Sequence, residues 1–233
     1  MELIFIRDNE EIRRRVTIRQ AIVAGWTGKD KDALDAHITE MRKKGIPAPT
    51  ETPMFYRVSP QLLTTESHIQ VVGRHSTGEV EAVVLSLEDG DWVGLGSDHT
   101  DRDVQRRSTA LSKQLCPKPI AATCWSLEDV GDHWDALELR SYVTVDGEEA
   151  PYQAGDIEVN LSYRELKALY EERHGAIVPG TAMFCGTVAA LRPVTFSTSF
   201  RMEMIDTARQ RRIDHAYTIE DLPLPDPLDD GES

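Results

Sequence analysis

The amino-acid sequence predicts an α+β fold that is mainly β, and two observations carry this prediction. Short runs of β-branched and aromatic residues succeed one another along the chain, separated by turn residues. Only two longer stretches show the apolar spacing of an amphipathic helix. The chain of 233 residues contains no internal repeat and is long enough to bury a core. Sheets with few helices are therefore expected.

The first part of the chain is expected to hold a strand and a helix. Residues 3–17 begin like a strand and continue into a run of three arginines, which indicates a solvated strand or a turn. Residues 31–44 are predicted to be helical, because Leu34, Ile38 and Met41 recur at helical spacing. A glycine stands directly after this stretch and prolines follow, so the helix is expected to end there.

The remaining elements are mostly strands. Four short strands are expected first, at residues 54–59, 68–73, 80–87 and 91–97. A short helix from Arg102 to Lys113 is predicted next, and then a hairpin over residues 136–155 with its turn at Asp146-Gly147. The last elements are a helix over residues 161–173 and strands at residues 181–187 and 196–205.

These elements suggest three parts of the chain. Residues 1–50 are an N-terminal strand and helix segment, and residues 51–220 form the main domain. Residues 221–233 are acidic and rich in proline, so this tail is expected to be disordered.

Composition limits the classes of partner. The chain has 26 basic and 40 acidic residues, which gives a formal net charge of -14. A surface of this sign repels phosphate, so neither nucleic acid nor a membrane is expected as a partner. A small acidic substrate remains compatible, because a local cation reverses the electric field inside a cleft.

Targeting signals and cysteine use point to a reduced compartment. No stretch approaches the about 18 continuous apolar residues of a transmembrane helix, and the N-terminus lacks a small-residue cleavage site. Cys116, Cys124 and Cys185 form no CxxC pair, which argues against a disulfide framework and a zinc–thiolate site. A cytoplasmic location is expected.

Three carboxylates are the first candidates for chemistry. Glu79 and Glu81 are two positions apart in an expected strand, so both side chains project from one face. Asp98 follows the next apolar run, where a strand end meets a loop. Oxygen ligands without cysteine suit a hard ion such as Mg²⁺ or Mn²⁺. The alternative is a strand with one solvated face, because Glu is usually exposed.

Other candidates lie on the expected helices and after a strand. His37 and Glu40 are three residues apart on one helix face, where the carboxylate would orient and polarise the imidazole. The alternative for His37 and Glu40 is an exposed surface pair, and the alternative for Lys113 is an ordinary solvated lysine. Gly186-Thr187 follows an apolar run and would present a backbone N–H and a hydroxyl to an anion, or simply form a turn.

Six segments, taken in order, resemble the motifs of the fumarylacetoacetate hydrolase superfamily. The resemblance runs from about residue 26 to residue 201. The segments are DALDAHITE, PMFYRVSP, GEVEAVVL, GSDHTDRDVQ, LSKQ and PGTAMFCGTV. The chain is also similar to a bacterial family known only as a domain of unknown function.

The resemblance implies a fold, a cofactor and roles for individual residues. It implies mixed, layered sheets or a β-roll with few helices, a homodimer, and one Mg²⁺ or Mn²⁺ held by Glu79, Glu81 and Asp98. The N-terminal segment would be lid-like. Its His37 and Glu40 would activate water, and Lys113 would stabilise an enolate. The residues that would contact substrate are Arg57, Arg102, Gln105 and Thr187.

Several positions depart from the superfamily pattern. The usual lysine of the PxxFxKP strand is replaced by Arg57, and the connections from Glu81 to Asp98 and from Gln105 to Lys113 are shortened. His99 stands beside the third carboxylate, where it would act as a further ligand, a proton carrier or a supporting residue. Trimmed connections are expected to change the substrate.

The function implied is cleavage or decarboxylation of a C–C bond in a small 2-oxo or 1,3-dicarbonyl acid, such as an acylpyruvate or oxaloacetate, through a metal-stabilised enolate. Two alternatives stay open. One is a hydratase or isomerase of the same superfamily. The other is a binding or regulatory protein that has kept the fold and lost catalysis, which the trimmed connections would favour.

Overall fold

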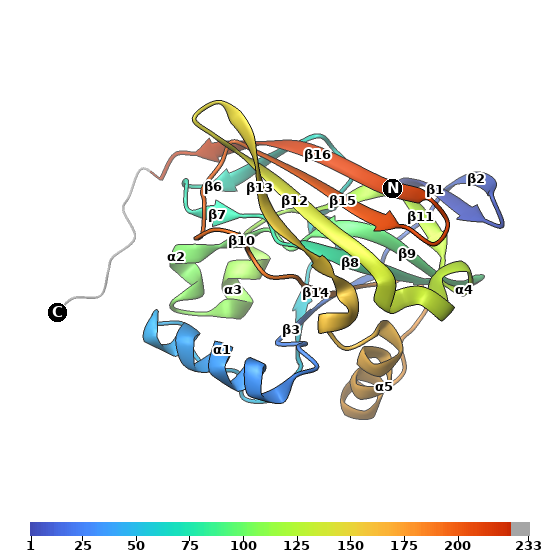
Figure 1. Ribbon diagram of the computed structural model, residues 1–233, viewed down its shortest axis with the longest axis horizontal. Helices are drawn as coiled ribbons and strands as arrows, with labels where there is room; N and C mark the ends of the chain where they lie inside the picture. The colour runs from blue at the N-terminus through green and yellow to red at the C-terminus, as the bar shows by residue number, and fades with distance from the viewer. Residues whose placement is uncertain (225–233) are drawn as a thin grey trace.

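The computed structural model describes residues 1–224 of the chain, and its strands form two large sheets that pack face to face (Figure 1). The larger sheet has the strand order β2 (Glu10–Arg15), β1 (Glu2–Arg7), β11 (Lys118–Ser126), β9 (Gly90–Ser97), β8 (Val80–Leu87), β14 (Thr181–Thr187), β3 (Gln20–Gly25) and β4 (Met54–Val58). The second has the order β13 (Glu148–Asp156), β12 (Leu137–Val145), β15 (Ser199–Asp206), β16 (Arg211–Leu222) and β6 (His68–Val72). A small pair is formed by β10 (Thr100–Asp101) and β7 (Ser76–Thr77).

The larger sheet curls back on itself. Strand β4 lies at one end of the sheet order, yet the chain turns directly from it into β5 (Leu63–Thr64), which pairs with β11. The inner face of this roll carries one apolar cluster, which includes Val83, Leu85 and Phe184. Gly96 lies where any side chain would collide with Val83 and Phe184, so this residue is small because the roll interior is tightly packed.

A second core lies between the two sheets. Alternate residues of β8, such as Val80, Ala82 and Val84, face this core, while Glu81 and Val83 face the roll interior. Helix α5 (Tyr163–His174) covers part of the core with Leu166 and is started by a capping box between Ser162 and Glu165. Each face of β8 is therefore buried, and a charged side chain on its inner face needs a specific reason.

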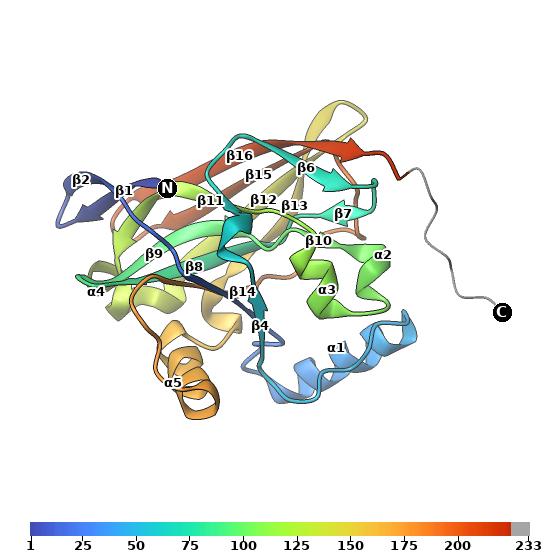
Figure 2. The ribbon, with the colours of Figure 1, turned by 180° about the vertical axis from the view of Figure 1, so that it is seen from behind.

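The other helices are short or loosely packed. They are α1 (Lys31–Lys43), α2 (Arg102–Gln105), α3 (Thr109–Gln114) and α4 (Leu127–Val130), and 3₁₀ turns cover Pro60–Leu62, Gly131–Ala136 and Ile157–Val159. Asp30 caps α1 by accepting from the backbone N–H groups of Asp32 and Ala33. No residue of α1 is buried, although its apolar stripe is less exposed than the rest. Figure 2 shows α1, α2 and α3 toward the same end of the molecule.

Most predicted elements are present, and one is split. The α+β, mainly β prediction is confirmed, as is the hairpin at Asp146-Gly147, whose two residues have positive φ. The single helix expected from Arg102 to Lys113 is two helices, because Ser108 accepts from the Leu111 N–H and starts a new one. Strands β3, β11 and β16 were not predicted.

Strands of the expected N-terminal segment take part in the larger sheet, and the division of the chain into three parts stays a prediction. Strands β1 and β3, from the segment 1–50, pair with β11 and β14 in the larger sheet, so only α1 and its connections leave the main domain. Strand β16 extends to Leu222, and most of the tail expected to be disordered, residues 225–233, lies outside the described residues. No helix within residues 1–224 is long and apolar enough to cross a membrane.

Candidate functional site

The three predicted carboxylates meet at one end of the roll. Strands β8 and β9 form a hairpin in which Val80 pairs with Ser97, so the start of one strand lies beside the end of the other. Glu79 and Glu81 flank Val80, and Asp98 directly follows Ser97. One oxygen from each carboxylate lies within 4.8 Å of the other two. Asp98 is fully buried and Glu81 nearly so, whereas 22% of the Glu79 side chain is exposed.

Glu81 is held by the backbone of a neighbouring strand. Strand β14 bulges after Phe184, and the Gly186 N–H donates to Glu81 Oε2 over 2.8 Å. Burial raises the pKa of Glu81 well above its usual value, and the charge of Asp98 adds to this effect. The charge of Lys113 offsets part of this increase, and further positive charge would favour the ionised form of Glu81.

Asp98 lies between two lysines. The Lys113 ammonium contacts Asp98 Oδ2 and is 3.9 Å from Glu79 Oε2, and the Lys118 ammonium is 3.4 Å from Asp98 Oδ1. Burial alone would raise the pKa of Asp98, but the two ammonium groups outweigh burial and hold this pKa below its usual value. The pKa of Lys113 is raised despite burial, because Asp98 and the two glutamates favour its charged form.

The guanidinium of Arg102 fixes the third carboxylate. It lies 3.0 Å from Glu79 Oε1, donates to the Thr77 hydroxyl and donates to Gln105 Oε1 over 3.0 Å. Arg102 is thus joined to the triad, and Gln105 is joined to Arg102. The predicted contact of these two residues with substrate stays a prediction.

Thr187 lies beside the site, but its hydroxyl is already engaged. The hydroxyl donates to the backbone oxygen of Val80 and accepts from Gln153 Nε2. Gln153 Oε1 in turn accepts from the Val80 N–H and from the Ser141 hydroxyl. Gln153 therefore ties β13 to the start of β8, and the Thr187 hydroxyl has no further proton to donate to a substrate carboxylate.

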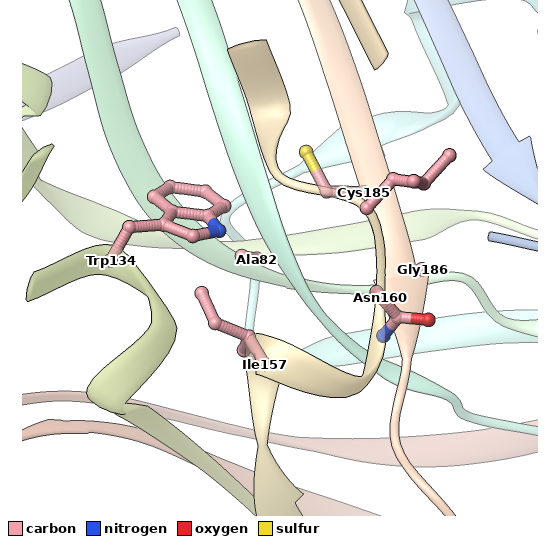
Figure 3. Close-up of a pocket in the computed structure, with 7 residues that line it drawn as sticks. Ala82, Trp134, Ile157, Asn160, Cys185 and Gly186 are labelled. Carbon is pink, nitrogen blue, oxygen red and sulfur yellow. The ribbon is translucent and has the colours of Figure 1, made fainter. Parts of the chain in front are cut away.

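A second set of hydrogen bonds supports the bulge in β14. The Thr27 hydroxyl donates to Asn160 Oδ1 over 2.8 Å, and Asn160 Nδ2 donates to the Thr187 backbone oxygen. A Cβ on Gly186 would lie 2.0 Å from the Thr27 hydroxyl, and the φ of Gly186 is +101°, so only glycine fits. Figure 3 shows Asn160 beside Gly186, at a crevice that has no room for a water molecule.

The predicted His–Glu pair is not joined to the triad by any described contact. His37 and Glu40 are both exposed on α1, and Glu40 accepts from Lys44 over 2.6 Å. This hydrogen bond and the Lys44 charge lower the pKa of Glu40. The His37 ring packs 5.6 Å from the ring of Trp26. Activation of water by the pair stays a prediction.

An aromatic pair nevertheless links α1 to the lysine side of the site. Trp26 Nε1 donates to the Tyr56 hydroxyl over 3.3 Å, and Lys113 Nζ lies 5.6 Å from the centre of the Tyr56 ring. The backbone of Trp26 has a φ of +59°, which is uncommon outside glycine and costs about 1–3 kcal/mol. The rest of the fold therefore imposes this position on the indole.

Two further candidates point away from the triad. Arg57 is exposed on β4, where neighbouring Tyr56 and Val58 face inward, so the alternation of the strand directs Arg57 to the opposite face. The buried His99 uses both ring nitrogens, toward the Tyr217 hydroxyl and the Ser76 hydroxyl. Burial, with Lys118 nearby, lowers the pKa of His99 to about 3, so the imidazole is neutral. Because both ring nitrogens are hydrogen-bonded, neither is left to bind a metal.

The donor set fits a divalent cation of the hard type. Three carboxylates converge, and Asp98 Oδ1 is a buried oxygen without a hydrogen-bond donor. A cation would also remove the cost of ionising Glu81. Magnesium prefers such oxygen ligands, which makes Glu79, Glu81 and Asp98 the residues that would hold it.

Three residues of the site were missed by the sequence analysis. No element was predicted around Lys118, Gln153 lies in the predicted hairpin without an assigned role, and Tyr56 lies in a predicted strand in which only Arg57 was given a role. The one available signal was Lys118 in the otherwise apolar stretch CPKPIAA.

Comparison with solved structures identifies the fold. A yeast fumarylacetoacetate hydrolase family protein superposes with a TM-score of 0.63 at 17% identity, covering 91% of this chain and 97% of that one. A 2-keto-3-deoxy-D-arabinonate dehydratase, complexed with magnesium and 2,5-dioxopentanoate, gives 0.63 at 13% identity and covers 92% and 85%. At these identities the likeness shows a shared fold. A search of curated protein sequences gave no significant match.

The family itself follows from the sequence match. Residues 24–217 match the family described as protein of unknown function (DUF2848), and this range contains the carboxylates, both lysines and the strands that position them. The chain therefore belongs to the DUF2848 family, built on the fold of the fumarylacetoacetate hydrolase family.

Proposed function

We propose that this protein is a metal-dependent hydrolase or lyase that breaks a C–C bond in a small 2-oxo or 1,3-dicarbonyl acid. The observation that carries the proposal is the convergence of Glu79, Glu81 and Asp98 with Lys113 at the end of a packed roll. Buried carboxylates at this density need positive charge beside them, and the raised pKa of Glu81 indicates that Lys113 does not fully offset the burial of this side chain.

The chain's own residues supply binding and charge. A divalent cation held by the triad would act as a Lewis acid toward oxygens of the substrate. Lys113 has a raised pKa and stays protonated, so its ammonium would stabilise negative charge that develops on a substrate oxygen. Arg102 fixes Glu79 and keeps its carboxylate directed at the site.

The proton-transfer role falls to His37 in this proposal. Its ring packs against Trp26, which donates to Tyr56, and the Tyr56 ring faces Lys113. Because α1 buries none of its residues, a small shift of the helix costs little packing energy and would bring His37 toward the site. A homodimer is part of the proposal, and light scattering in solution tests it separately.

Turnover of acylpyruvates and of oxaloacetate, with added Mg²⁺ or Mn²⁺, tests the proposal. The parent should show metal-dependent turnover, and Glu81→Ala should lose it. Lys167→Ala, a lysine change on α5 outside the site, is the matched control and should keep full activity. Equal activity of the parent and Glu81→Ala would refute the metal mechanism.

Two alternatives have their own support. The similarity to a dehydratase with bound magnesium favours a hydratase or isomerase reaction, which hydration assays with 2-oxo sugar acids would reveal. The pairing of Glu40 with Lys44, on an exposed helix, favours a binding protein without catalysis. Mn²⁺ binding without turnover of any small acid would support that second alternative.

A further inference from the structure

Lys118 is a fully buried lysine at the start of β11. Its side chain has 0% exposure, and its ammonium donates to the backbone oxygens of His99, over 2.6 Å, and Cys116, over 3.3 Å. Burying an ammonium group costs several kcal/mol unless it is paired. The only carboxylate recorded within ion-pair distance of Lys118, in the described part of the chain, is Asp98. The buried charge of Lys118 is therefore paired with Asp98.

The two lysines at Asp98 approach opposite oxygens. Lys113 comes from the short helix α3, contacts Oδ2 and also lies near Glu79, so it is on the triad side. Lys118 lies 3.4 Å from Oδ1 and is anchored by two backbone carbonyls of the core. Lys113 therefore faces the triad, whereas Lys118 is anchored in the core behind Asp98.

We propose that Lys118 is a positioning residue that fixes the Asp98 carboxylate as a ligand for a divalent cation. Its ammonium is itself held by two backbone carbonyls and lies beside Oδ1, so it fixes the carboxylate where it faces Glu79 and Glu81. Carboxylates that bind a metal are themselves held by neighbouring groups. Loss of such a neighbour typically lowers metal affinity by about 10- to 100-fold. This proposal rests on the proposed metal site and adds a residue to it.

Two effects of Lys118 on a bound cation oppose each other. Its positive charge repels the cation, while its contact with Oδ1 keeps the Asp98 carboxylate oriented. Oδ1 accepts no hydrogen bond, and Lys118 is the only cationic group described within ion-pair distance of this oxygen. Without Lys118 the carboxylate would be free to rotate, and rotation would withdraw it from the cation. Positioning is therefore the larger effect.

Direct titration with Mn²⁺, followed by electron paramagnetic resonance of the free ion, tests the proposal without an activity assay. Lys118→Met should keep the side-chain volume and weaken the Kd for Mn²⁺ about 10- to 100-fold. Lys167→Met removes the same charge from a partly exposed ion pair on α5 and should leave the Kd unchanged. If Lys118→Met does not fold, as shown by circular dichroism, Lys118→Gln is titrated in its place.

A double-mutant cycle separates positioning from general support of the fold. In an Asp98→Asn background, Lys118→Met should change the Kd by less than about 3-fold, because Lys118 acts through Asp98. An undiminished effect in that background would overturn the proposal, and so would unchanged or tighter binding by Lys118→Met alone. Absence of Mn²⁺ binding by the parent would instead overturn the metal site and, with it, this inference.

Discussion

The triad end of the roll and helix α1 hold their charged groups in opposite ways. Glu81, Asp98 and Lys118 are buried, and each has a partner fixed by the backbone of a paired strand or by another buried charge. His37 and Glu40 lie on a helix with no buried residue, and the carboxylate pairs with a neighbouring surface lysine. The first region is ordered before any ligand arrives, while the second is held by few contacts.

This difference shows where each kind of chemistry can be placed. A cation site needs ligands held to within a fraction of an ångström, which strand ends in a packed core provide. A proton-transferring pair on a loosely packed helix can approach and leave, which suits a step that also requires substrate entry. Substitutions in the two regions should therefore act on different observables.

The largest effect is expected for Glu81→Gln, which keeps the side-chain shape and removes the buried charge. Mn²⁺ affinity should fall by at least about 100-fold, more than the loss of an outer partner causes. The metal-free variant should be at least as stable as the parent near neutral pH, because no proton or cation is needed to neutralise residue 81. Isothermal titration calorimetry and urea unfolding measure the two quantities.

The pH dependence of the parent provides the control for this substitution. A raised folded-state pKa means that the stabilising proton on Glu81 is fully bound below the pKa of the unfolded carboxyl. That contribution is lost as the pH rises through the folded-state pKa, and a cation then takes its place. The increase in Tm caused by Mn²⁺ should therefore grow with pH in the parent and not in Glu81→Gln. A pH-independent increase in the parent would contradict this assignment.

A smaller effect, confined to activity, is expected for His37→Ala. General acid–base catalysis contributes about 10²–10⁴-fold, so kcat/KM should fall within that range. The free energy of unfolding should change by less than about 0.5 kcal/mol, because the side chain is exposed. His68→Ala, an exposed histidine on β6, is the matched control. Unchanged turnover in His37→Ala would remove α1 from the mechanism.

The smallest effect is expected for Lys44→Ala. The substitution removes the hydrogen bond and the charge that lower the pKa of Glu40, so this pKa should move up toward that of an ordinary carboxyl group. A pH titration of the Glu40 side chain by nuclear magnetic resonance measures the shift, with Lys31→Ala as a control at the other end of the helix. An unmoved midpoint would mean that Glu40 has another partner in solution.

Local patterns explain which parts of the site were predictable. The side-chain period of two put Glu79 and Glu81 on one face, and Asp98 stands where the neighbouring strand ends, so a simple hairpin unites them. The apolar stripe of residues 161–173 predicted helix α5, and Asp146-Gly147 predicted the hairpin turn. Each of these signals lies within a few residues of the structure that it predicts.

The missed elements lacked such local signals. In strand β16 the buried residues Ile213, Tyr217 and Ile219 are separated by charged residues. The charged residues obscured the apolar pattern by which a strand is predicted. Strand β11 begins with Lys118 and a proline, residues that are uncommon in buried strands, and pairing with β1 and β9 buries it. Burial of these residues depends on partners far away in the sequence.

The sequence by itself determined the mainly β fold, the two strands that carry the three carboxylates, and the family to which the chain belongs. Only the tertiary structure decided that Asp98 lies between two lysines, that Gly186 binds Glu81, and that the hydroxyl of Thr187 is already engaged. The physical reason is that strand alternation and turns are set by neighbours in the chain. The charge environment of a buried group, in contrast, is set by strands that meet only when the sheet curls into a roll.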